Sequence, residues 1–218
     1  VMELENTRAV MVGNEVEGIR NLFTMMNAMR LAVGVQGSAI ANAATLHAIE
    51  YARERPQGGN PDQPAVMICE HADVKRMLLE MTAQSELLRA LTLRTAACLD
   101  LADITEDADQ ARTQRKLAEL LLPIAKTLGA EWGFQVANQG IQVLGGYGYT
   151  NDYPLERMAR DIRVASIYEG TSGIQALDFV KRKLLGDDQQ TMHTLMASID
   201  ESLGNAAADK PWHQPLAD

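Results

Sequence analysis

One glutamate in the last quarter of the chain stands where a carboxylate can do chemistry. Glu169 lies in the segment IYEGTSG, between a tyrosine and a glycine. The glycine allows a sharp bend or the close approach of a ligand, and Thr171 or Ser172 is a suitable N-cap for a following helix. A helix N-terminus favours an ionised carboxylate, and its free N–H groups bind an oxyanion or a carbonyl oxygen. The pattern predicts either a reactive carboxylate or an ordinary acidic residue at a helix start.

The residues around this glutamate carry a family resemblance. The segment QVLGGYGYTNDYPLERMARDIRVASIYEGTSGIQ resembles the C-terminal helical domain of flavin-dependent acyl-CoA dehydrogenases. Upstream, FTMMNAMRLAVGVQGSAIANAATLHAIEYARER resembles the first long helix of that domain, and VMVGNEVEGI resembles the exit from the family's β-domain. Separate motifs in the expected order are more specific than one glycine-rich string. The resemblance covers about residues 11–185.

The resemblance implies α,β-dehydrogenation of an acyl-CoA thioester. In that reaction a base removes an α-proton while the β-hydrogen leaves as hydride to FAD. By its position in IYEGTSG, Glu169 matches the catalytic base of the family. Some relatives carry the base on the first helix, at the position that Met29 occupies here. Methionine cannot accept the proton, so the base is assigned to Glu169.

Three further residues match positions on the substrate side of the family's site. Arg30 matches an arginine near the acyl-CoA, and Asn27 stands where relatives often have a polar residue that contacts the substrate. Gly170 allows the close approach of a ligand. The alternatives are a salt-bridged helix arginine for Arg30 and a solvated helix residue for Asn27.

The resemblance places FAD contacts in two regions of the chain. Arg55 and Gln57 match residues that reach the flavin pyrophosphate of a neighbouring subunit, and arginine suits phosphate because its planar fork carries several donors. His71 matches another flavin-side position. Where many relatives have phenylalanine followed by glycine, this chain has Gly58 followed by Gly59. The loop therefore lacks the aromatic contact that the phenylalanine makes in those relatives.

The second flavin region follows the third predicted helix. Gln142, Gly145 and Gly146 match the family segment that approaches the adenine side of the flavin, in the family often from another subunit. Glycines permit that approach. Thr171 matches a position near the cofactor.

The resemblance also predicts the domain organisation. Residues 1–17 correspond to the end of a preceding β-domain or a linker, 18–186 to the C-terminal helical domain, and 187–218 to a helical extension and tail. We therefore expect a piece of a longer flavoprotein, inactive by itself. The implied partners are acyl-CoA, further copies of the chain in a homodimer or homotetramer, and electron-transfer flavoprotein as electron acceptor.

Two other functions stay open. One is a helical assembly or interaction module that keeps the fold without catalysis. The departure at Gly58 would suit it, as would Gly173, which replaces a side chain that is frequently polar in the family. The other is an acyl-CoA oxidase, in which oxygen rather than electron-transfer flavoprotein reoxidises the cofactor.

Hydrophobic periodicity predicts an all-α, antiparallel helical bundle. Long helices are expected over about residues 23–55, 71–101 and 111–144, with a loop at 56–64. The first of them begins with the segment FTMMN of the resemblance. A remnant strand is expected near 10–12. Apolar residues at helical spacing predict the buried face of the first helix; they are Leu22, Met25, Met26, Met29 and Val33.

Composition narrows the classes of partner and cellular location that the protein can have. The chain has 218 residues, of which 46% are hydrophobic, and a net charge of −9. The acidic balance argues against nucleic acid as a partner. Cys69 and Cys98 have no metal-site or redox spacing, so we expect no metal and two small core residues. No apolar run reaches membrane-spanning length and no signal peptide is visible, which predicts a cytoplasmic protein without a membrane partner.

Overall fold

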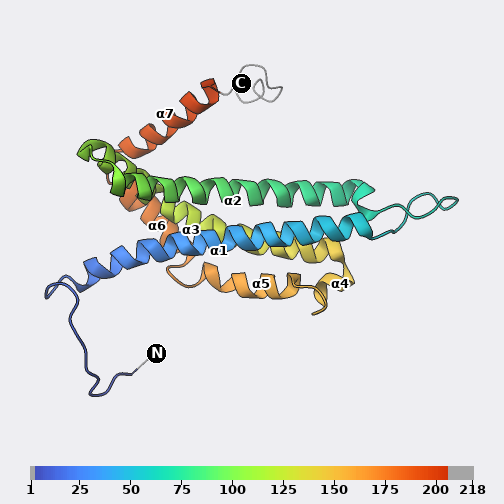
Figure 1. The fold of residues 1–218 in the computed structure, drawn as a ribbon, viewed down its shortest axis with the longest axis horizontal. Helices are drawn as coiled ribbons and strands as arrows, with labels where there is room; N and C mark the ends of the chain where they lie inside the picture. The colour runs from blue at the N-terminus through green and yellow to red at the C-terminus, as the bar shows by residue number, and fades with distance from the viewer. Residues whose placement is uncertain (1–2, 206–218) are drawn as a thin grey trace.

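The computed structural model describes residues 3–205, and three long helices dominate it. They are α1 (Gly18–Glu54), α2 (Ala72–Ile104) and α3 (Ala108–Leu144), each antiparallel to the one before (Figure 1). The all-α bundle and its three long helices are confirmed. Each helix end lies within about five residues of its expected position, a normal scatter for sequence-derived boundaries.

Shorter elements follow α3 and cover one side of the bundle. They are α4 (Gly146–Tyr149), α5 (Leu155–Arg163), the 3₁₀ turn η2 (Val164–Ser166), α6 (Ser172–Leu177) and the π-helical segment η3 (Asp178–Leu184). A further 3₁₀ turn, η1 (Ile68–Glu70), precedes α2. The expected C-terminal helix is α7 (Gln190–Asn205), which projects away from the bundle (Figure 1). The expected tail beyond it lies outside the described residues.

The predicted strand at residues 10–12 is wrong. Residues 7–12 carry no regular secondary structure, and no strand occurs within residues 3–205; the one β-bridge found there joins Pro56 to Met67. A strand needs a partner backbone. The apolar run Val10–Val12 has none beside it and is exposed.

Local signals explain where α3 begins and ends. The Asp107 carboxylate accepts hydrogen bonds from the N–H groups of Asp109 and Gln110, at 2.9 and 3.2 Å, which caps the helix after a three-residue connection. Gly145 ends it in the left-handed region, with φ +62°. Pro123 lies inside the helix without ending it.

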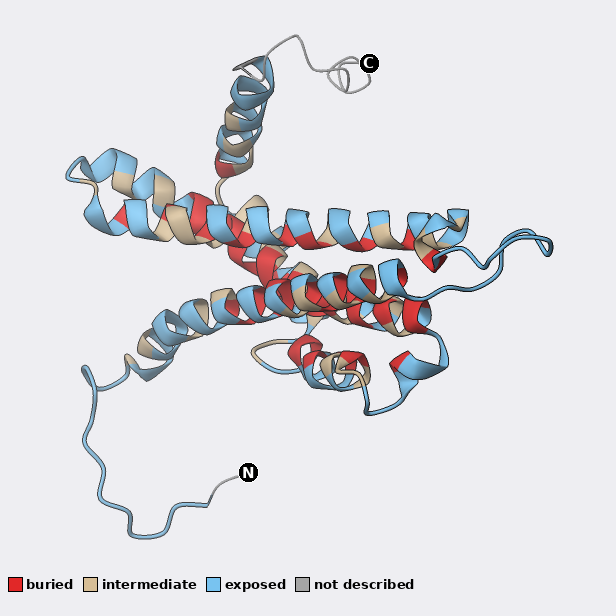
Figure 2. Cartoon of the chain, turned by 45° about the vertical axis from the view of Figure 1, so that its right-hand side comes forward, coloured by how far each residue is buried: buried red, intermediate tan, exposed pale blue. Residues whose placement is uncertain are grey.

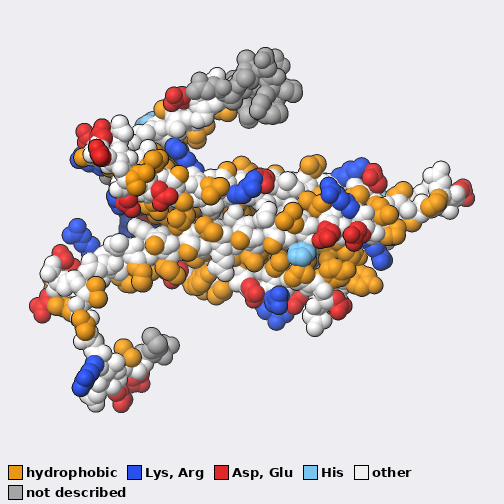
Figure 3. Space-filling view, in the orientation of Figure 1, with side chains coloured by type: hydrophobic (Ala, Val, Ile, Leu, Met, Phe, Trp, Pro, Cys, Tyr) orange, Lys and Arg blue, Asp and Glu red, His pale blue; other side chains and the backbone are white. Residues whose placement is uncertain are grey.

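The buried face of α1 agrees with the prediction only in part: Val33 is buried, but most of the predicted residues are not. Leu22, Met25 and Met29 are exposed, the two methionines at 56% and 41%. Figure 2 shows that the first third of α1 lies largely outside the core, and Figure 3 shows hydrophobic side chains on the surface of the bundle. Small residues make the actual contact with α3; the buried ones include Gly34, Gly37, Ser38, Ala41, Ala44, Ala48 and Ala52.

Close approach of two backbones explains this small-residue face. A Cβ placed on Gly37 would lie 1.9 Å from the carbonyl oxygen of Gly129, and one on Gly129 would lie 2.8 Å from the Cα of Gly34. Such spacing leaves no room for any side chain larger than hydrogen. The methionines of α1 therefore lie on other faces of the helix.

Large apolar residues fill the buried faces of α2 and α3 at their centres. Met81, Leu88 and Cys98 of α2 are fully or almost fully buried, as are Leu120 and Val136 of α3. Cys98 is a core residue as expected, and Cys69 is half-buried; both thiols are free. No helix in the described part of the chain is long and apolar enough to cross a membrane.

Candidate active site

Glu169 lies in a tight turn between η2 and α6. Its own φ is +54° and that of Gly170 is +92°, so two successive residues adopt left-handed backbone. Glutamate rarely adopts this conformation, and non-glycine residues that do often lie at functional sites. As predicted, Thr171 caps the following helix, with its Oγ1 accepting a hydrogen bond from the Ile174 N–H at 3.4 Å.

Side chains from the long helices hold the residues on either side of Glu169. The Tyr168 hydroxyl donates to Gln36 Oε1 on α1 at 2.7 Å. From α3, Lys126 Nζ donates to the Gly170 carbonyl at 2.5 Å, and the Glu131 carboxylate accepts from the Ser172 hydroxyl at 2.7 Å. The turn is thus tied to two helices at residues 168, 170 and 172.

The main chain of Glu169 is held as well, while its carboxylate is left free. Gln175 Nε2 donates to the Glu169 carbonyl at 3.1 Å. The carboxylate oxygen Oε2 is buried and has no hydrogen-bond partner among the described residues. Buried polar atoms are nearly always paired, so one without a partner calls for an explanation. A carboxylate in this position is able to accept a proton from a bound molecule.

A buried lysine lies beneath the turn. Lys126 is fully buried at the middle of α3. Burial lowers the pKa of its ammonium group; the Glu131 carboxylate raises it, the Arg30 guanidinium lowers it and the Glu169 carboxylate raises it. Four ionisable groups from α1, α3 and the turn therefore share one poorly solvated region.

Arg30 is a buried, salt-bridged residue. Its Nη1 lies 2.8 Å from Asp178 Oδ2, and the two side chains are only 7% and 5% exposed. Asp178 is the first residue of η3, so the pair joins α1 to the segment that follows α6. Asn27 is half-buried and lies nearly one helical turn before Arg30 on α1.

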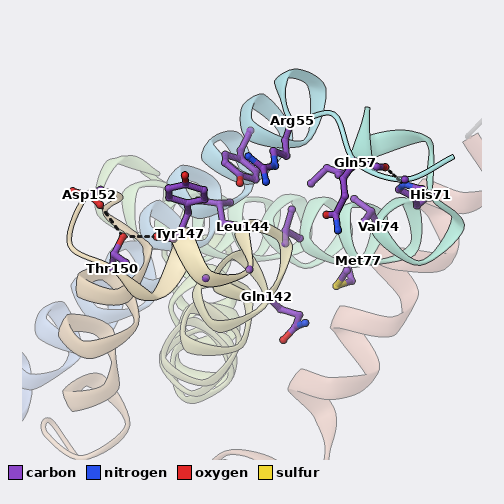
Figure 4. A pocket seen from close by; sticks show the side chains of 16 residues that line it. Arg55, Gln57, His71, Val74, Met77, Gln142, Leu144, Tyr147, Thr150 and Asp152 are labelled. Carbon is purple, nitrogen blue, oxygen red and sulfur yellow. Dashed lines mark hydrogen bonds between the residues drawn. The ribbon is translucent and has the colours of Figure 1, made fainter. Parts of the chain in front are cut away.

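A second candidate site lies at the C-terminal end of α1. A pocket of about 750 Å³ opens between the C-terminal end of α1, the loop after it, the start of α2 and the segment after α3 (Figure 4). Six residues of the sequence prediction line it, from two separate regions of the chain: Arg55, Gln57, His71, Gln142, Gly145 and Gly146. The structure thus brings together the residues that the resemblance assigns to FAD, except Thr171, which lies in the Glu169 turn.

The walls of this pocket combine a cation, aromatic rings and an ordered loop. The Arg55 guanidinium lies over the Tyr147 ring, 5.7 Å from its centroid, and Tyr51 contacts Tyr147 at 6.4 Å between ring centroids. His71 Nε2 lies 2.7 Å from the Gln57 carbonyl. The carbonyl only accepts, so Nε2 carries the hydrogen and fixes the loop on the start of α2.

The glycines of the pocket leave room that a side chain would fill. Gly58 and Gly145 have φ of +70° and +62°, which favours glycine at both positions. Gly146 has no such requirement, and no described atom lies within 4 Å of the place a Cβ would take. No other part of the described chain packs against this face of Gly146, which is open toward the pocket.

The structure does not bring the two groups of predicted residues together. Gln36, which holds the Glu169 turn, and Tyr51, which lines the pocket, are 15 residues apart on α1, or roughly 22 Å at 1.5 Å per residue. Glu169, Gly170 and Thr171 share the turn, and the pocket is lined by other residues. Within residues 3–205, no group of three or more His, Cys, Asp or Glu side chains is placed to hold a metal ion.

Sequence reasoning missed several residues of both places. It did not foresee Lys126, Glu131 and Gln175 at the turn, or Tyr51, Tyr147, Thr150 and Asp152 in the pocket. One signal was present: Lys126 interrupts the apolar run LLLPIAKTLGA, where a charged residue is unusual. The aromatic run GGYGY was the other.

Comparison with known proteins matches both the chain and its fold. Residues 16–184 match the model of the acyl-CoA dehydrogenase C-terminal domain. The 3-methylmercaptopropionyl-CoA dehydrogenase of Ruegeria pomeroyi is 42% identical over 96% of this chain and 37% of that protein. The broad-specificity linear acyl-CoA dehydrogenase of Mycobacterium tuberculosis is 35% identical over 91% of this chain and 34% of that protein.

A solved structure extends the match to three dimensions. The butyryl-CoA dehydrogenase of Megasphaera elsdenii is similar with a TM-score of 0.64 and 28% identity, over 79% of this chain and 40% of that one. The chain thus spans well under half the length of each of these proteins. Since one family model covers most of its length and its helices follow the same fold, the chain belongs to the acyl-CoA dehydrogenase family, whose C-terminal helical domain it contains.

Proposed function

We propose that the protein containing this chain is an FAD-dependent acyl-CoA dehydrogenase and that Glu169 is its catalytic base. The observation that carries the proposal is the buried Glu169 oxygen, which has no partner in the described structure, on a turn whose neighbours are all held. A base must be fixed in direction and free to accept a proton, and this arrangement meets both needs.

The reaction assigns a balanced role to the carboxylate. Glu169 takes the proton from the α-carbon of the thioester, and the electron pair of that C–H bond becomes the new carbon–carbon double bond. The hydrogen on the β-carbon leaves with its own electron pair as hydride. FAD supplies the acceptor for that hydride. A positioned general base contributes roughly 10²- to 10⁴-fold to the rate.

The pocket at the end of α1 fits the nucleotide half of FAD. Arg55 offers a planar cation for the pyrophosphate, and His71 keeps Gln57 and its loop in place. Gly146 leaves the pocket floor open to a ligand. Tyr147 is 49% exposed at its rim and presents an aromatic surface on which an adenine ring would stack, an interaction of about 1–3 kcal/mol.

The substrate class follows from the relatives. Their names specify 3-methylmercaptopropionyl-CoA, linear acyl-CoA and butyryl-CoA, all thioesters of unbranched acyl groups. Since cyclohexane-1-carbonyl-CoA dehydrogenase of Geobacter metallireducens is also a relative, we propose acyl-CoA thioesters as the substrate class, with Asn27 and Gly170 on the substrate side. The buried pair with Asp178 favours a supporting role for Arg30 over direct contact with the substrate.

Assembly and electron transfer complete the proposal. Arg55, Gln57, Gln142, Gly145 and Gly146 serve the flavin of a neighbouring copy in a homodimer or homotetramer, and electron-transfer flavoprotein removes the electrons. An acyl-CoA oxidase would instead be reoxidised by oxygen. Rapid oxygen consumption by the substrate-reduced protein distinguishes the oxidase.

Anaerobic bleaching of the flavin absorbance tests the base directly. The full-length protein is mixed with butyryl-CoA or 3-methylmercaptopropionyl-CoA, and its Glu169→Gln variant is treated in the same way. Loss of the base should slow bleaching by about 10²- to 10⁴-fold. Glu86→Gln, in an exposed pair with Arg89, is the matched control and should bleach at the wild-type rate.

Two results would contradict the proposal. Wild-type bleaching in Glu169→Gln would remove the base assignment. A wild-type protein that holds no flavin, or holds it without bleaching, would favour a helical assembly module on the same fold.

A further inference from the structure

Lys126 is a buried charged group that the proposed reaction does not use. We propose that it is a positioning residue: its ammonium group holds the Gly170 carbonyl and thereby fixes the direction of the Glu169 carboxylate. The inference rests on the proposed function of Glu169. It concerns a residue 43 positions earlier in the chain, on α3.

The hydrogen bond from Lys126 to the Gly170 carbonyl is short, and the second donor to that oxygen is distant. Lys126 Nζ lies 2.5 Å from the Gly170 carbonyl oxygen. The other donor to this oxygen is Gln175 Nε2, at a long 3.4 Å, and that amide lies closer to the Glu169 carbonyl, at 3.1 Å. Lys126 is therefore the main anchor of the peptide between Gly170 and Thr171, one peptide beyond the base.

The conformation of the turn explains why an anchor is needed. Glu169 and Gly170 are both left-handed, and glutamate does not hold that conformation without support. If the Gly170 carbonyl were released, the backbone torsions of Gly170 would be free to change, and the direction of the neighbouring Glu169 side chain would no longer be fixed from this side. A misplacement of about 1 Å in a reacting group can cost 10²-fold in rate, so a fixed peptide matters for catalysis.

The position of Lys126 is costly for a purely structural residue. It is fully buried among the apolar residues of α3, where burial lowers the pKa of its ammonium group. Replacing buried charged groups by apolar side chains of similar size often stabilises a protein. A buried cation kept at such a place, directly beneath a candidate base, fits a role in the site better than a role in folding.

Charged groups of α1, α3 and the Glu169 turn act on this lysine. Glu131 on α3 and Glu169 in the turn favour its charged form, and Arg30 on α1 opposes it. Glu131 is itself bonded to Ser172, two residues after Gly170. Lys126 and Glu131 thus hold the turn from one helix on both sides of Thr171.

Two substitutions separate positioning from packing. Lys126→Met keeps the shape and removes the donor and the charge, whereas Lys126→Arg keeps both. Lys116→Met is the matched control, since Lys116 is on the same helix with its side chain half exposed and only a 3.9 Å contact to Asp187. All variants are made in the full-length holoenzyme. Lys126→Gln, which retains a neutral donor, takes the place of Lys126→Met if that variant does not fold.

Hydrogen–deuterium exchange and bleaching kinetics are then measured on each variant. In Lys126→Met, exchange at residues 168–173 should rise about tenfold or more while α2 stays protected. Bleaching at saturating butyryl-CoA should slow about 10- to 100-fold with little change in the half-saturating concentration. Lys126→Arg should recover most of both effects, Lys126→Gln should fall between, and Lys116→Met should match the wild type.

The outcomes distinguish this inference from the proposed function. Unchanged exchange and bleaching in Lys126→Met, or in Lys126→Gln if only that variant folds, would overturn the positioning role. So would an Lys126→Arg protein no better than Lys126→Met. If the wild type does not bleach, the proposed function fails, and exchange alone still decides whether Lys126 holds the turn.

Discussion

At the scale of single residues, the candidate base and its supports come from different kinds of information. Glu169 could be found from seven consecutive residues, because a helix cap and a flexible glycine are local signals. Lys126, Gln36 and Glu131 could not, because each meets the turn only after the chain folds back over more than 40 residues. Their partners are set by the packing of the helices.

Arg30 shows how burial changes the interpretation of a motif residue. The resemblance assigns it to the acyl-CoA site, while the structure pairs it with Asp178 out of contact with solvent. Arg182 lies 3.6 Å from the same carboxylate but is largely exposed. Most of the compensation for the buried Asp178 charge therefore comes from Arg30.

We expect Arg30→Met to lower the free energy of unfolding by about 3 kcal/mol, because it leaves a buried carboxylate largely uncompensated. Urea denaturation measures the loss. Arg76→Met is the control, since its pairs with Asp73 and Glu80 are exposed and surface pairs contribute about 0–1 kcal/mol.

A double variant checks the cause of that loss. Arg30→Met combined with Asp178→Leu buries no charge, so it should recover part of the stability that Arg30→Met loses. A single Arg30→Met variant as stable as the wild type would instead show that the ion pair is not what joins α1 to η3.

At the scale of elements, helical periodicity predicted which segments are helices but only part of the buried face of α1, such as Val33. Large apolar side chains such as Met25 and Met29 marked the expected face, yet small residues make the contact with α3. Burial depends on how closely two backbones approach, and that distance is a property of the helix pair. The prediction of a strand near residue 10 was wrong for a similar reason, because a β-strand must pair with a second segment of backbone.

The glycine contact between α1 and α3 gives a test at this scale. Gly37→Ala should lower the free energy of unfolding by about 1–3 kcal/mol or more, because its methyl group would overlap the Gly129 carbonyl, a rigid backbone group. Thermal unfolding followed by circular dichroism measures the change.

The control for this test is a helical glycine with open surroundings. No described atom lies within 4 Å of a Cβ on Gly204 in α7, so Gly204→Ala should be neutral or stabilising by up to about 1 kcal/mol. Equal stability of Gly37→Ala and the wild type would mean that α1 and α3 separate easily, against the close packing described above.

At the scale of the whole molecule, α1 links the two candidate places. Its middle holds the Glu169 turn through Gln36, and its end carries the pocket that contains Arg55. The residues of that pocket come from α1, α2 and the segment after α3, which explains why motif matching could name six of them but could not show that they meet. The shared pocket depends on the antiparallel packing of all three helices.

The separation of the two places leads to a prediction about assembly. In the proposed homo-oligomer, Glu169 of one copy works with the flavin held by Arg55 of its neighbour. Arg55→Ala and Glu169→Gln should each abolish most activity at limiting FAD when present in every copy. A mixed dimer of the two variants keeps one intact site, so random mixing should restore about a quarter of wild-type activity, given a two-fold symmetric dimer with half of the dimers mixed.

Co-expression of the two variants with different affinity tags isolates the mixed dimer, which should show about half of wild-type activity because one of its two sites is intact. The double variant Arg55→Ala/Glu169→Gln, co-expressed with wild type, is the matched control, because its mixed dimers carry one defect in each site and should be inactive. No recovery in the first mixture, together with activity in the mixed dimers of the second, would place both residues in the same copy's site. Recovery confined to the first mixture requires the two residues to act across the interface between copies.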